Sequence, residues 1–385
     1  MIPLSVPLLD GNEWKYVKEC LDTGWISSAG AYVNQFEDMV AAHAGAKYGV
    51  ACMNGTVGLH IAQILCGVEA NDHVIAPNIT FIATLNAIKY TGATPILIDV
   101  CPKSWQMDLD LLESYLLENT ITKEIGGELF SFHKVTGKRV KAIMPVHVLG
   151  NIGDMDKLIA IAKRYHLRII EDSTEALGSR YKGKHSGSFG DFGVFSFNGN
   201  KIISTGGGGV IVTDDEALAK KAKHLTTQAK TSAMVYIHDE IGYNYRLVNV
   251  LAAIGVAQME QFPKVLDNKR NMDAFYRSNL EGVGDIIFQE VSADVEENCW
   301  LFTFKTAYMR DLLAYLNANG VQSRPFWKPM NQLDMFNQDI YVTEKDYSNS
   351  VYESAISIPS SAGITTAEMN EVVKTIQAFY KNTIQ

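Results

Sequence analysis

The feature that most constrains the fold is an alternation of short apolar runs with longer amphipathic segments, which extends from about residue 47 to residue 214. Short apolar runs predict buried strands, whereas the longer amphipathic segments predict helices. The expected strands cover residues 48–52, 73–76, 95–98, 140–145, 167–170, 193–197 and 209–213, and the expected helices cover residues 57–67, 81–90, 109–117 and 155–165. Strands and helices in this order are typical of a large doubly wound α/β domain with a mixed sheet.

Helices are expected on both sides of this region. Upstream, Asp10 is in position to cap a helix that runs to about residue 21, with Glu13 as the N3 partner of a capping box. A second helix is expected over residues 32–43. Downstream, the apolar helix over residues 248–261 is expected to end at Pro263, because proline disrupts the interior of a helix.

The remainder of the chain indicates a smaller α+β domain. It begins with a long helix over residues 264–280 and continues with strands over residues 285–291 and 299–305 and helices over residues 310–319 and 366–380. We therefore predict two units. The first, residues 1–262, holds the N-terminal segment and the large domain, and the second, residues 263–385, holds the linking helix and the small domain.

Charge and composition exclude several classes of protein. With 34 Lys and Arg against 43 Asp and Glu, the net charge of -9 disfavours a broad nucleic-acid surface or an anionic membrane as partner. No run approaches the roughly 20 apolar residues of a membrane helix, and no basic residue precedes the short N-terminal apolar stretch. The five cysteines are scattered and form no CxxC pair. A cytoplasmic protein is expected.

An acid and a lysine stand out in the segment from residue 169 to residue 215. Asp172 directly follows an apolar run, so it is expected at the carboxyl end of a central strand, where open α/β sheets bind ligands; a helix cap is the alternative. Lys201 lies between apolar residues, although a solvated surface lysine is the more ordinary reading. A desolvated lysine can form a Schiff base with an aldehyde. The pair therefore suits pyridoxal 5'-phosphate, whose ring nitrogen needs an anionic partner.

A phosphate cradle is predicted at the sequence NGTVGLH, residues 54–60, which follows a strand and opens a helix. Gly55 would allow close approach of the backbone, and Thr56 offers a hydroxyl group. The four-glycine run at residues 206–209 is followed by a strand-like GVIVT rather than by GK[ST], so it predicts a tight turn. No GxGxxG opens the first βα unit, and no HExxH or similar histidine set predicts a metal site.

The chain closely resembles the sugar aminotransferases of the DegT/DnrJ/EryC1/StrS family, which are fold-type-I pyridoxal-phosphate enzymes. The resemblance runs almost end to end and rests on GWISSAGAYVNQFE, NGTVGLH, PNITFIATLNAI, EDSTEALGS, GSFGDFGVFSFNGNKIISTGGGG, GYNYRLVNVLAAIGVAQ, RPFWKP and ISIPSS. It implies that Lys201 forms the Schiff base with the cofactor and that Asp172 is the partner of the pyridine nitrogen. It also implies cofactor contacts by Gly55, Thr56, Phe81, Glu175, Ser196, Asn198 and Asn244.

Three of these implied roles are specific. Phe81 lies where family members stack an aromatic ring on the cofactor, with ordinary core packing as the alternative. Glu175 occupies a position often filled by Gln near the phenolic oxygen of the cofactor. Asn244 resembles the residue that reaches the phosphate bound by the neighbouring subunit, so a homodimer with shared active sites is expected.

The resemblance also implies a substrate. GWISSAG, the segment that ends in HKVTGKRVKAIMPVHVLGN, and RPFWKPM look most like enzymes that aminate C-4 of UDP-2-acetamido-2,6-dideoxy-4-keto-hexoses for surface glycans, with L-glutamate as amino donor. Some relatives that deoxygenate C-3 carry His in place of the lysine, so Lys201 argues against that reaction. Asn331 departs from the family, which often has His there.

The substrate site is expected near SRPFWKP. Arg324 and Lys328 are the candidate donors to a diphosphate, and Trp327 and Phe326 could pack on a sugar or base or simply in the core. Two alternatives stay open. One is the same transamination on a GDP- or dTDP-linked ketosugar, and the other is a cofactor-bound regulator without turnover.

Overall fold

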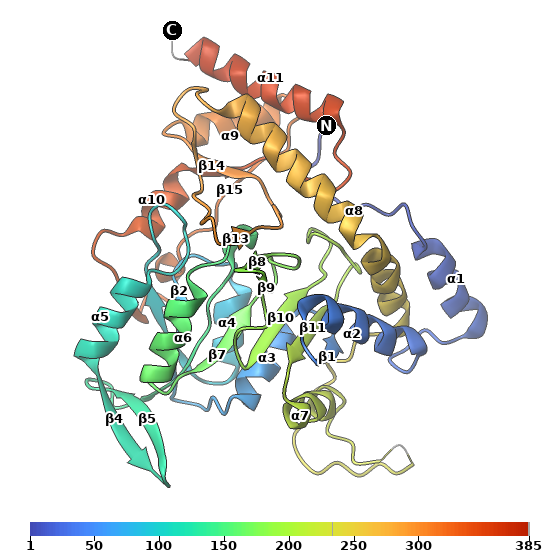
Figure 1. Cartoon of the computed structure of the whole chain (residues 1–385), viewed down its shortest axis with the longest axis vertical. Helices are drawn as coiled ribbons and strands as arrows, with labels where there is room; N and C mark the ends of the chain where they lie inside the picture. Colours follow the sequence, from blue (N-terminus) through green and yellow to red (C-terminus); the bar gives the residue numbers. More distant parts are fainter. Residues whose placement is uncertain (233, 384–385) are drawn as a thin grey trace.

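Figure 1 shows the computed structural model, which describes residues 1–232 and 234–383. Among these residues, ten strands form one mixed sheet with the path β1-β11-β10-β7-β6-β2-β3-β16, and β5 joins β4 to β6 beside this path. The strands are β1 (Tyr48–Cys52), β2 (His73–Pro77), β3 (Thr94–Ile98), β4 (Thr120–Ile125), β5 (Glu128–His133), β6 (Arg139–Ile143), β7 (Arg168–Asp172), β10 (Phe192–Ser196), β11 (Gly209–Thr213) and β16 (Ile340–Val342). The seven predicted strands are thus all present, and the doubly wound mixed sheet is confirmed.

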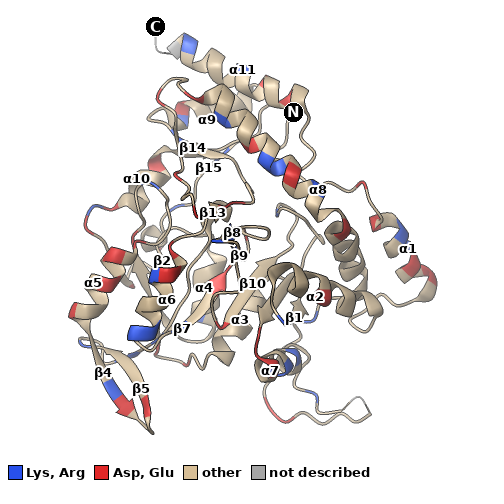
Figure 2. Ribbon diagram, viewed as in Figure 1, with Lys and Arg blue, Asp and Glu red and all other residues tan. Residues whose placement is uncertain are grey.

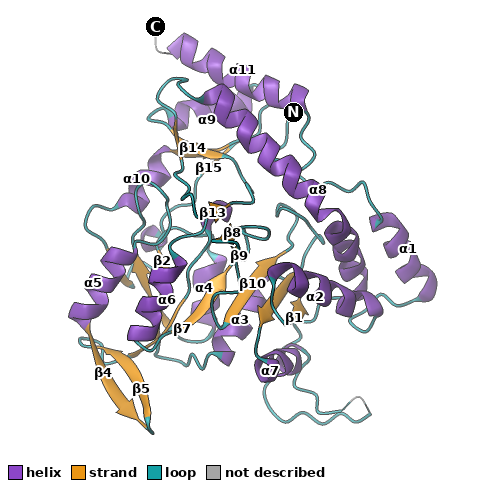
Figure 3. Cartoon of the chain, viewed as in Figure 1, coloured by secondary structure: helices purple, strands orange, loops and turns teal. Residues whose placement is uncertain are grey.

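Both faces of this sheet are buried. Successive residues of a strand point to opposite faces. Accordingly, Val50 and Ile211 pack in one hydrophobic cluster, whereas their neighbours Ala51 and Val210 pack in another. The first cluster receives helices α3 (Gly55–Leu65), α4 (Ala83–Tyr90) and α7 (Glu216–Thr226), and the second receives α2 (Ala31–Ala44) and α8 (Asn249–Leu280). Figure 3 shows the strands lying between the helical layers.

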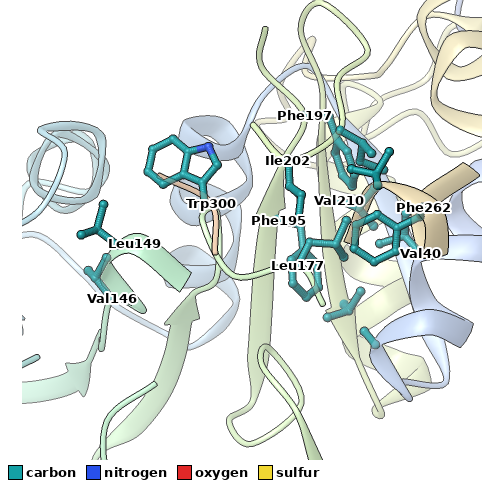
Figure 4. Packing of buried hydrophobic residues seen from close by; sticks show 14 of the residues in the cluster. Val40, Val146, Leu149, Leu177, Phe195, Phe197, Ile202, Val210, Phe262 and Trp300 are labelled. Carbon is teal, nitrogen blue, oxygen red and sulfur yellow. The ribbon is translucent and has the colours of Figure 1, made fainter. Parts of the chain in front are cut away.

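The second of these clusters reaches from α2 and α8 across the sheet to Trp300. Figure 4 shows Phe195 and Val210 from the sheet beside Val40 of α2 and Phe262 of α8. Trp300 belongs to the same cluster. Side chains in a protein interior are closely packed. The packing in this cluster therefore fixes the positions of the strands that contribute to it.

The smaller part of the molecule lies at the top of Figure 1 and includes the C-terminal helix and the strands labelled β14 and β15. A four-stranded antiparallel sheet has the order β12-β14-β17-β15, and a three-stranded sheet has the order β13-β8-β9. Their strands are β8 (Arg180–Tyr181), β9 (Lys184–His185), β12 (Ile287–Phe288), β13 (Val295–Glu296), β14 (Thr303–Lys305), β15 (Arg324–Pro325) and β17 (Ala355–Ser357). The other helices of the chain are α1 (Glu13–Thr23), α5 (Leu109–Asn119), α6 (Met155–Arg164), α9 (Met309–Ala318), α10 (Tyr347–Ser354) and α11 (Thr366–Thr383).

The predicted break at Pro263 is wrong, because α8 runs through this residue as one helix from Asn249 to Leu280. A proline inside a helix costs about 3 kcal/mol. Packing on both sides of it offsets this cost, since Phe262 and Val265 are buried in the core of the large sheet and Tyr276 is buried in the small part. The helix therefore connects the two parts of the molecule without interruption.

The predicted cap of the first helix is also wrong. Helix α1 begins at Glu13, with Asn12 at the N-cap position and no side-chain cap bond. Asp10 instead accepts a hydrogen bond from Lys264 Nζ at 2.8 Å, and the Glu13 carboxylate is turned toward Gln258 of α8. Tertiary partners thus compete successfully with the local capping box.

Several elements were not predicted from the sequence. They are the hairpin of β4 and β5, the helices α7 and α10, and the strands β8, β9, β13, β15, β16 and β17. Strand β16 pairs in parallel with β3 at the edge of the large sheet. The predicted strands over residues 285–291 and 299–305 shorten to β12 and β14. Residues of the C-terminal part thus enter the large sheet, and the division into units 1–262 and 263–385 stays a prediction.

Charged residues are interspersed on the outer elements, with both signs on α1, α8 and the β4–β5 hairpin in Figure 2. The described helices include none that is both long enough and apolar enough to cross a membrane.

Candidate active site

A cavity of about 560 Å³ opens at the carboxyl ends of the central strands. The start of α3, the loop before α4, the residues that follow β7 and β10, and the segments at Trp300 and at β15 all contribute to its wall. This position, where strand ends meet helix starts, is the one at which open α/β sheets bind ligands. Of the predicted site residues, the cavity is lined by Gly55, Thr56, Phe81, Asp172, Glu175, Ser196, Asn198, Lys201, Arg324 and Trp327.

Asp172 is the last residue of β7 and is 3% exposed. Its Oδ2 accepts a hydrogen bond from the Thr84 hydroxyl group at 2.7 Å, and its Oδ1 accepts one from the backbone N–H of Thr174 at 3.2 Å. Within the described chain, no helix starts directly after Asp172, so it is not a helix cap. The two hydrogen bonds fix the orientation of the Asp172 side chain at the cavity wall.

Lys201 lies in the loop that follows β10, and its side chain is largely buried. Its Nζ is 3.8 Å from Oε1 of Glu175 and 4.2 Å from the centroid of the Trp300 ring. Burial lowers the pKa of the Lys201 ammonium group, and the Glu175 and Asp172 carboxylates oppose this shift. A lysine in such a place can become a neutral amine and hence a nucleophile.

Glu175 is buried in the cavity wall opposite Lys201. Its Oε2 accepts a hydrogen bond from the backbone N–H of Leu149 at 2.8 Å. Burial raises the pKa of Glu175 to about 7, although the nearby ammonium group of Lys201 acts to lower it. Burial thus favours the neutral form of both groups, and the charge of each opposes this effect in the other.

The helix α3 starts at the place where the phosphate cradle is predicted. The Asn54 side chain accepts a hydrogen bond from the backbone N–H of Val57 at 3.0 Å and so caps the helix. The first N–H groups of a helix have no partner within it and attract anions. A Cβ on Gly55 would lie 2.9 Å from Cγ2 of Thr174 and 3.1 Å from Cβ of Ser196, so only glycine fits between these walls.

This donor set fits pyridoxal phosphate. The start of α3 offers N–H groups to a phosphate, Asp172 offers a buried carboxylate to a ring nitrogen, and Lys201 offers an amine to an aldehyde. The N–H groups, the carboxylate and the amine all line the same cavity, so one small molecule that carries a phosphate, a ring nitrogen and an aldehyde can contact all of them.

Aromatic residues close the other side of the cavity. Trp327 stacks on Trp300 with ring centroids 6.4 Å apart, and Trp300 donates its indole N–H to the carbonyl oxygen of Asn200 at 2.7 Å. Phe326 is buried in the core, whereas Phe81 is 53% exposed, with its centroid 6.5 Å from that of Trp327. Stacking of Phe81 on the cofactor stays a prediction.

Two predicted residues do not line the cavity of their own chain. Asn244 is exposed and pairs through its backbone with Thr227, and Lys328 is also exposed. Asn331, the residue that departs from the family pattern, exchanges two hydrogen bonds with Asn78, at 2.8 and 2.9 Å. These two hydrogen bonds fix the Asn331 side chain and backbone against Asn78.

Sequence reasoning missed Thr84, Leu149 and Trp300. Thr84 of α4 shares a hydrogen bond with Thr80, four residues earlier, and donates one to Asp172 of β7. Trp300 contacts Lys201 from a segment 99 residues later in the chain. No local sequence pattern marks contacts between segments so far apart. The aromatic residue in CWLF was the one available signal for Trp300.

Comparison with known proteins identifies the family of the chain. A model of the DegT/DnrJ/EryC1/StrS aminotransferase family matches residues 7–377. The GDP-perosamine synthase of Escherichia coli O157:H7 is 37% identical over 388 residues, which cover 99% of each chain. That of Caulobacter vibrioides is 36% identical and covers 97% of this chain and 96% of its own.

Two further relatives are informative. A UDP-N-acetyl-3-dehydro-alpha-D-glucosamine 3-aminotransferase of Acidithiobacillus ferrooxidans is 33% identical over 302 residues, 78% of this chain and 76% of its own. Among solved structures, the PLP form of a putative sugar aminotransferase from Streptococcus pneumoniae superposes with a TM-score of 0.88, covers 99% of each chain and is 24% identical. This last likeness concerns the fold.

Proposed function

Because the chain belongs to the DegT/DnrJ/EryC1/StrS aminotransferase family, we propose that it moves the amino group of L-glutamate to the keto carbon of a nucleotide-linked sugar. The chain is an enzyme, a pyridoxal-phosphate-dependent nucleotide-sugar aminotransferase. The observation that carries the proposal is the meeting of Lys201, Asp172 and the start of α3 in one cavity. A cofactor-bound regulator would share this lysine, so turnover with glutamate and a ketosugar is what separates the two functions.

The residues divide the work in this proposal. Bound pyridoxal phosphate supplies an electron sink for the carbon that carries the amino group. Asp172 would be the anionic partner of the ring nitrogen, and the N–H groups at the start of α3 would hold the phosphate together with Ser196. Asn198 would be a further cofactor contact. Lys201 Nζ would be the attachment point and would accept and donate the proton that the transfer of the amino group requires, first with glutamate and then with the ketosugar.

The nucleotide to which the sugar is linked is the part of this proposal that the sequence and the structure constrain least. The sequence motifs predict a UDP-linked N-acetylated 4-ketosugar, and this remains a prediction. Two relatives that match nearly the whole chain at 36–37% identity are named as synthases of a GDP-linked product, whereas the UDP-type relative matches 78% of the chain. We therefore propose a GDP-linked ketosugar as the first substrate to test, with amination at C-4 and a role in surface polysaccharide synthesis.

The test is a panel of GDP-, UDP- and dTDP-linked 4-ketosugars, each assayed with glutamate at equal concentrations. Preferential turnover of the GDP sugar supports the proposal, and preferential turnover of the UDP sugar restores the carrier predicted from sequence. If no nucleotide ketosugar is aminated by the cofactor-loaded protein, the proposed function is wrong.

We expect Arg324→Ala to raise the KM for the nucleotide sugar by about tenfold or more, because Arg324 is a cationic donor at the cavity wall and can bind a diphosphate. The KM for glutamate should change by less than about twofold. Lys374→Ala is the control, since Lys374 is an exposed residue of α11 outside the cavity lining. An equal rise in both KM values for Arg324→Ala would contradict this assignment.

We also propose a homodimer in which Asn244 completes the phosphate site of the partner. Mixing the inactive chains Lys201→Ala and Asn244→Ala should then restore about a quarter of the wild-type activity, because half of the dimers are hybrids with one intact site. The control is Asn370→Ala, an exposed residue of α11, which should be fully active alone. No recovery after verified chain exchange would contradict a shared site.

A further inference from the structure

Two titratable side chains of opposite type face each other inside the cavity. Lys201 Nζ lies 3.8 Å from Oε1 of Glu175, and the side chains are 11% and 2% exposed. The Trp300 ring covers the amine at 4.2 Å. Two charges in such a place pay a large desolvation penalty, so a neutral pair competes with an ion pair.

The Glu175 carboxyl group is held so that one oxygen is left for Lys201. Its Oε2 accepts the 2.8 Å hydrogen bond from Leu149 N–H, and Leu149 has a φ of 62°, which is uncommon for a residue other than glycine. Asn298 donates from Nδ2 to the carbonyl oxygens of Glu175 and Leu177 at 2.8 and 2.9 Å. The backbone and the far oxygen of Glu175 are therefore both anchored.

We propose that Glu175 is the proton acceptor for Lys201. An N–H bond of the Lys201 ammonium group breaks, an O–H bond forms at Oε1 of Glu175, and the electron pair stays on Nζ. The products are a neutral carboxyl group and a neutral amine. The separation of 3.8 Å closes to hydrogen-bond distance by rotation of the lysine side chain, as is common when ligand-free sites tighten. The inference rests on the proposed function, because the freed amine is the group that would bind the cofactor aldehyde.

The charges around the pair are consistent with this transfer. Burial raises the pKa of Glu175 and lowers that of Lys201, so the two values approach each other. Asp172, at the end of β7, adds a negative charge that raises both values. Arg324 lines the cavity from β15, and His147, two residues before Leu149, is engaged with Glu171 at 2.9 Å.

The experiment measures how fast Lys201 of the cofactor-free protein reacts with trace acetic anhydride between pH 5 and pH 11, relative to a small amine of known pKa in the same solution. Acetic anhydride is small, does not itself titrate and acylates an amine only in its neutral form, and each lysine is quantified by mass spectrometry of the digest. If the proton is shared, the rate rises in two steps, with a plateau of roughly a tenth or more of the final rate between them. Exposed Lys103 in the same digest should show one step.

Glu175→Gln removes the acceptor at nearly constant shape, and we expect its profile at Lys201 to show a single step. Glu297→Gln is the matched control, because burial also raises the pKa of Glu297 to about 7 but its partner is Arg277, away from the cavity. This variant should keep both steps. Glu175→Asp, which shortens the carboxyl arm by one methylene, should lower the plateau.

A single step in the wild-type protein would overturn the proposal, since a fixed ion pair has no plateau; this result does not depend on any variant folding. A plateau that persists in a folded Glu175→Gln protein would overturn the role of Glu175. The readout is independent of turnover. An intact plateau without transamination of any ketosugar would count against the proposed function alone, and transamination without a plateau would count against this inference alone.

Discussion

Lys201→Ala should abolish transamination, with kcat reduced by about 10⁴-fold or more. The substitution removes the amine that lies in the cavity beside Glu175 and Trp300, and with it both the covalent attachment point and the group that moves the proton. Steady-state assays with glutamate and the preferred nucleotide ketosugar measure the rate. Borohydride reduction followed by mass spectrometry should attach the cofactor to wild-type protein at Lys201 and leave the variant unmodified.

The control for this prediction is Lys220→Ala. Lys220 is an exposed lysine of α7 that pairs with Glu216 one turn away, so its loss should change neither rate nor labelling. Near wild-type turnover by a folded Lys201→Ala protein would remove Lys201 from the reaction.

Asp172→Asn should lower kcat by roughly 100- to 1000-fold while leaving the protein folded. The amide is nearly isosteric and can still accept the hydrogen bond from Thr84, so the floor of the cavity is kept. It carries no charge, however, and therefore no longer holds a proton on the ring nitrogen. The rate is measured at saturating cofactor, and the fraction of bound cofactor is followed by its absorbance.

Asp154→Asn is the control variant for Asp172→Asn, because it makes the same substitution at an aspartate outside the cavity. Asp154 caps α6 through a hydrogen bond from the backbone N–H of Lys157, and asparagine caps helices equally well. This variant should retain full activity. An unchanged rate for Asp172→Asn with retained cofactor would reduce Asp172 to a structural acceptor of hydrogen bonds.

Patterns within a single segment were sufficient for most of the large domain. The strand over residues 48–52 was predicted at its observed bounds. A short apolar run is stable mainly when it is buried, and a run of this length fits a buried strand. The cradle at Gly55 was equally visible, since a short Asn-Gly-Thr start after a strand is a local feature. Asp172 and Lys201 followed from their positions relative to such runs.

Elements whose stability comes from distant partners were predicted less well. Helix α8 continues through Pro263 because Phe262, Val265 and Tyr276 are buried against two different cores, which no local proline rule takes into account. Strand β16 has only three residues and is stabilised by its pairing with β3, more than 240 residues earlier. Asp10 pairs with Lys264 instead of capping α1.

The sequence by itself thus determined seven strands of the large sheet, the start of α3 and the two groups, Asp172 and Lys201, that suit the cofactor. Each of these follows from hydrophobic periodicity or from the chemistry of one short segment. Only the tertiary structure decided what surrounds them. Thr84 reaches Asp172, Leu149 orients Glu175, and Trp300 covers Lys201. The physical reason is that a pKa or an orientation depends on burial and on partners brought in from distant segments, and these exist only once the chain is folded.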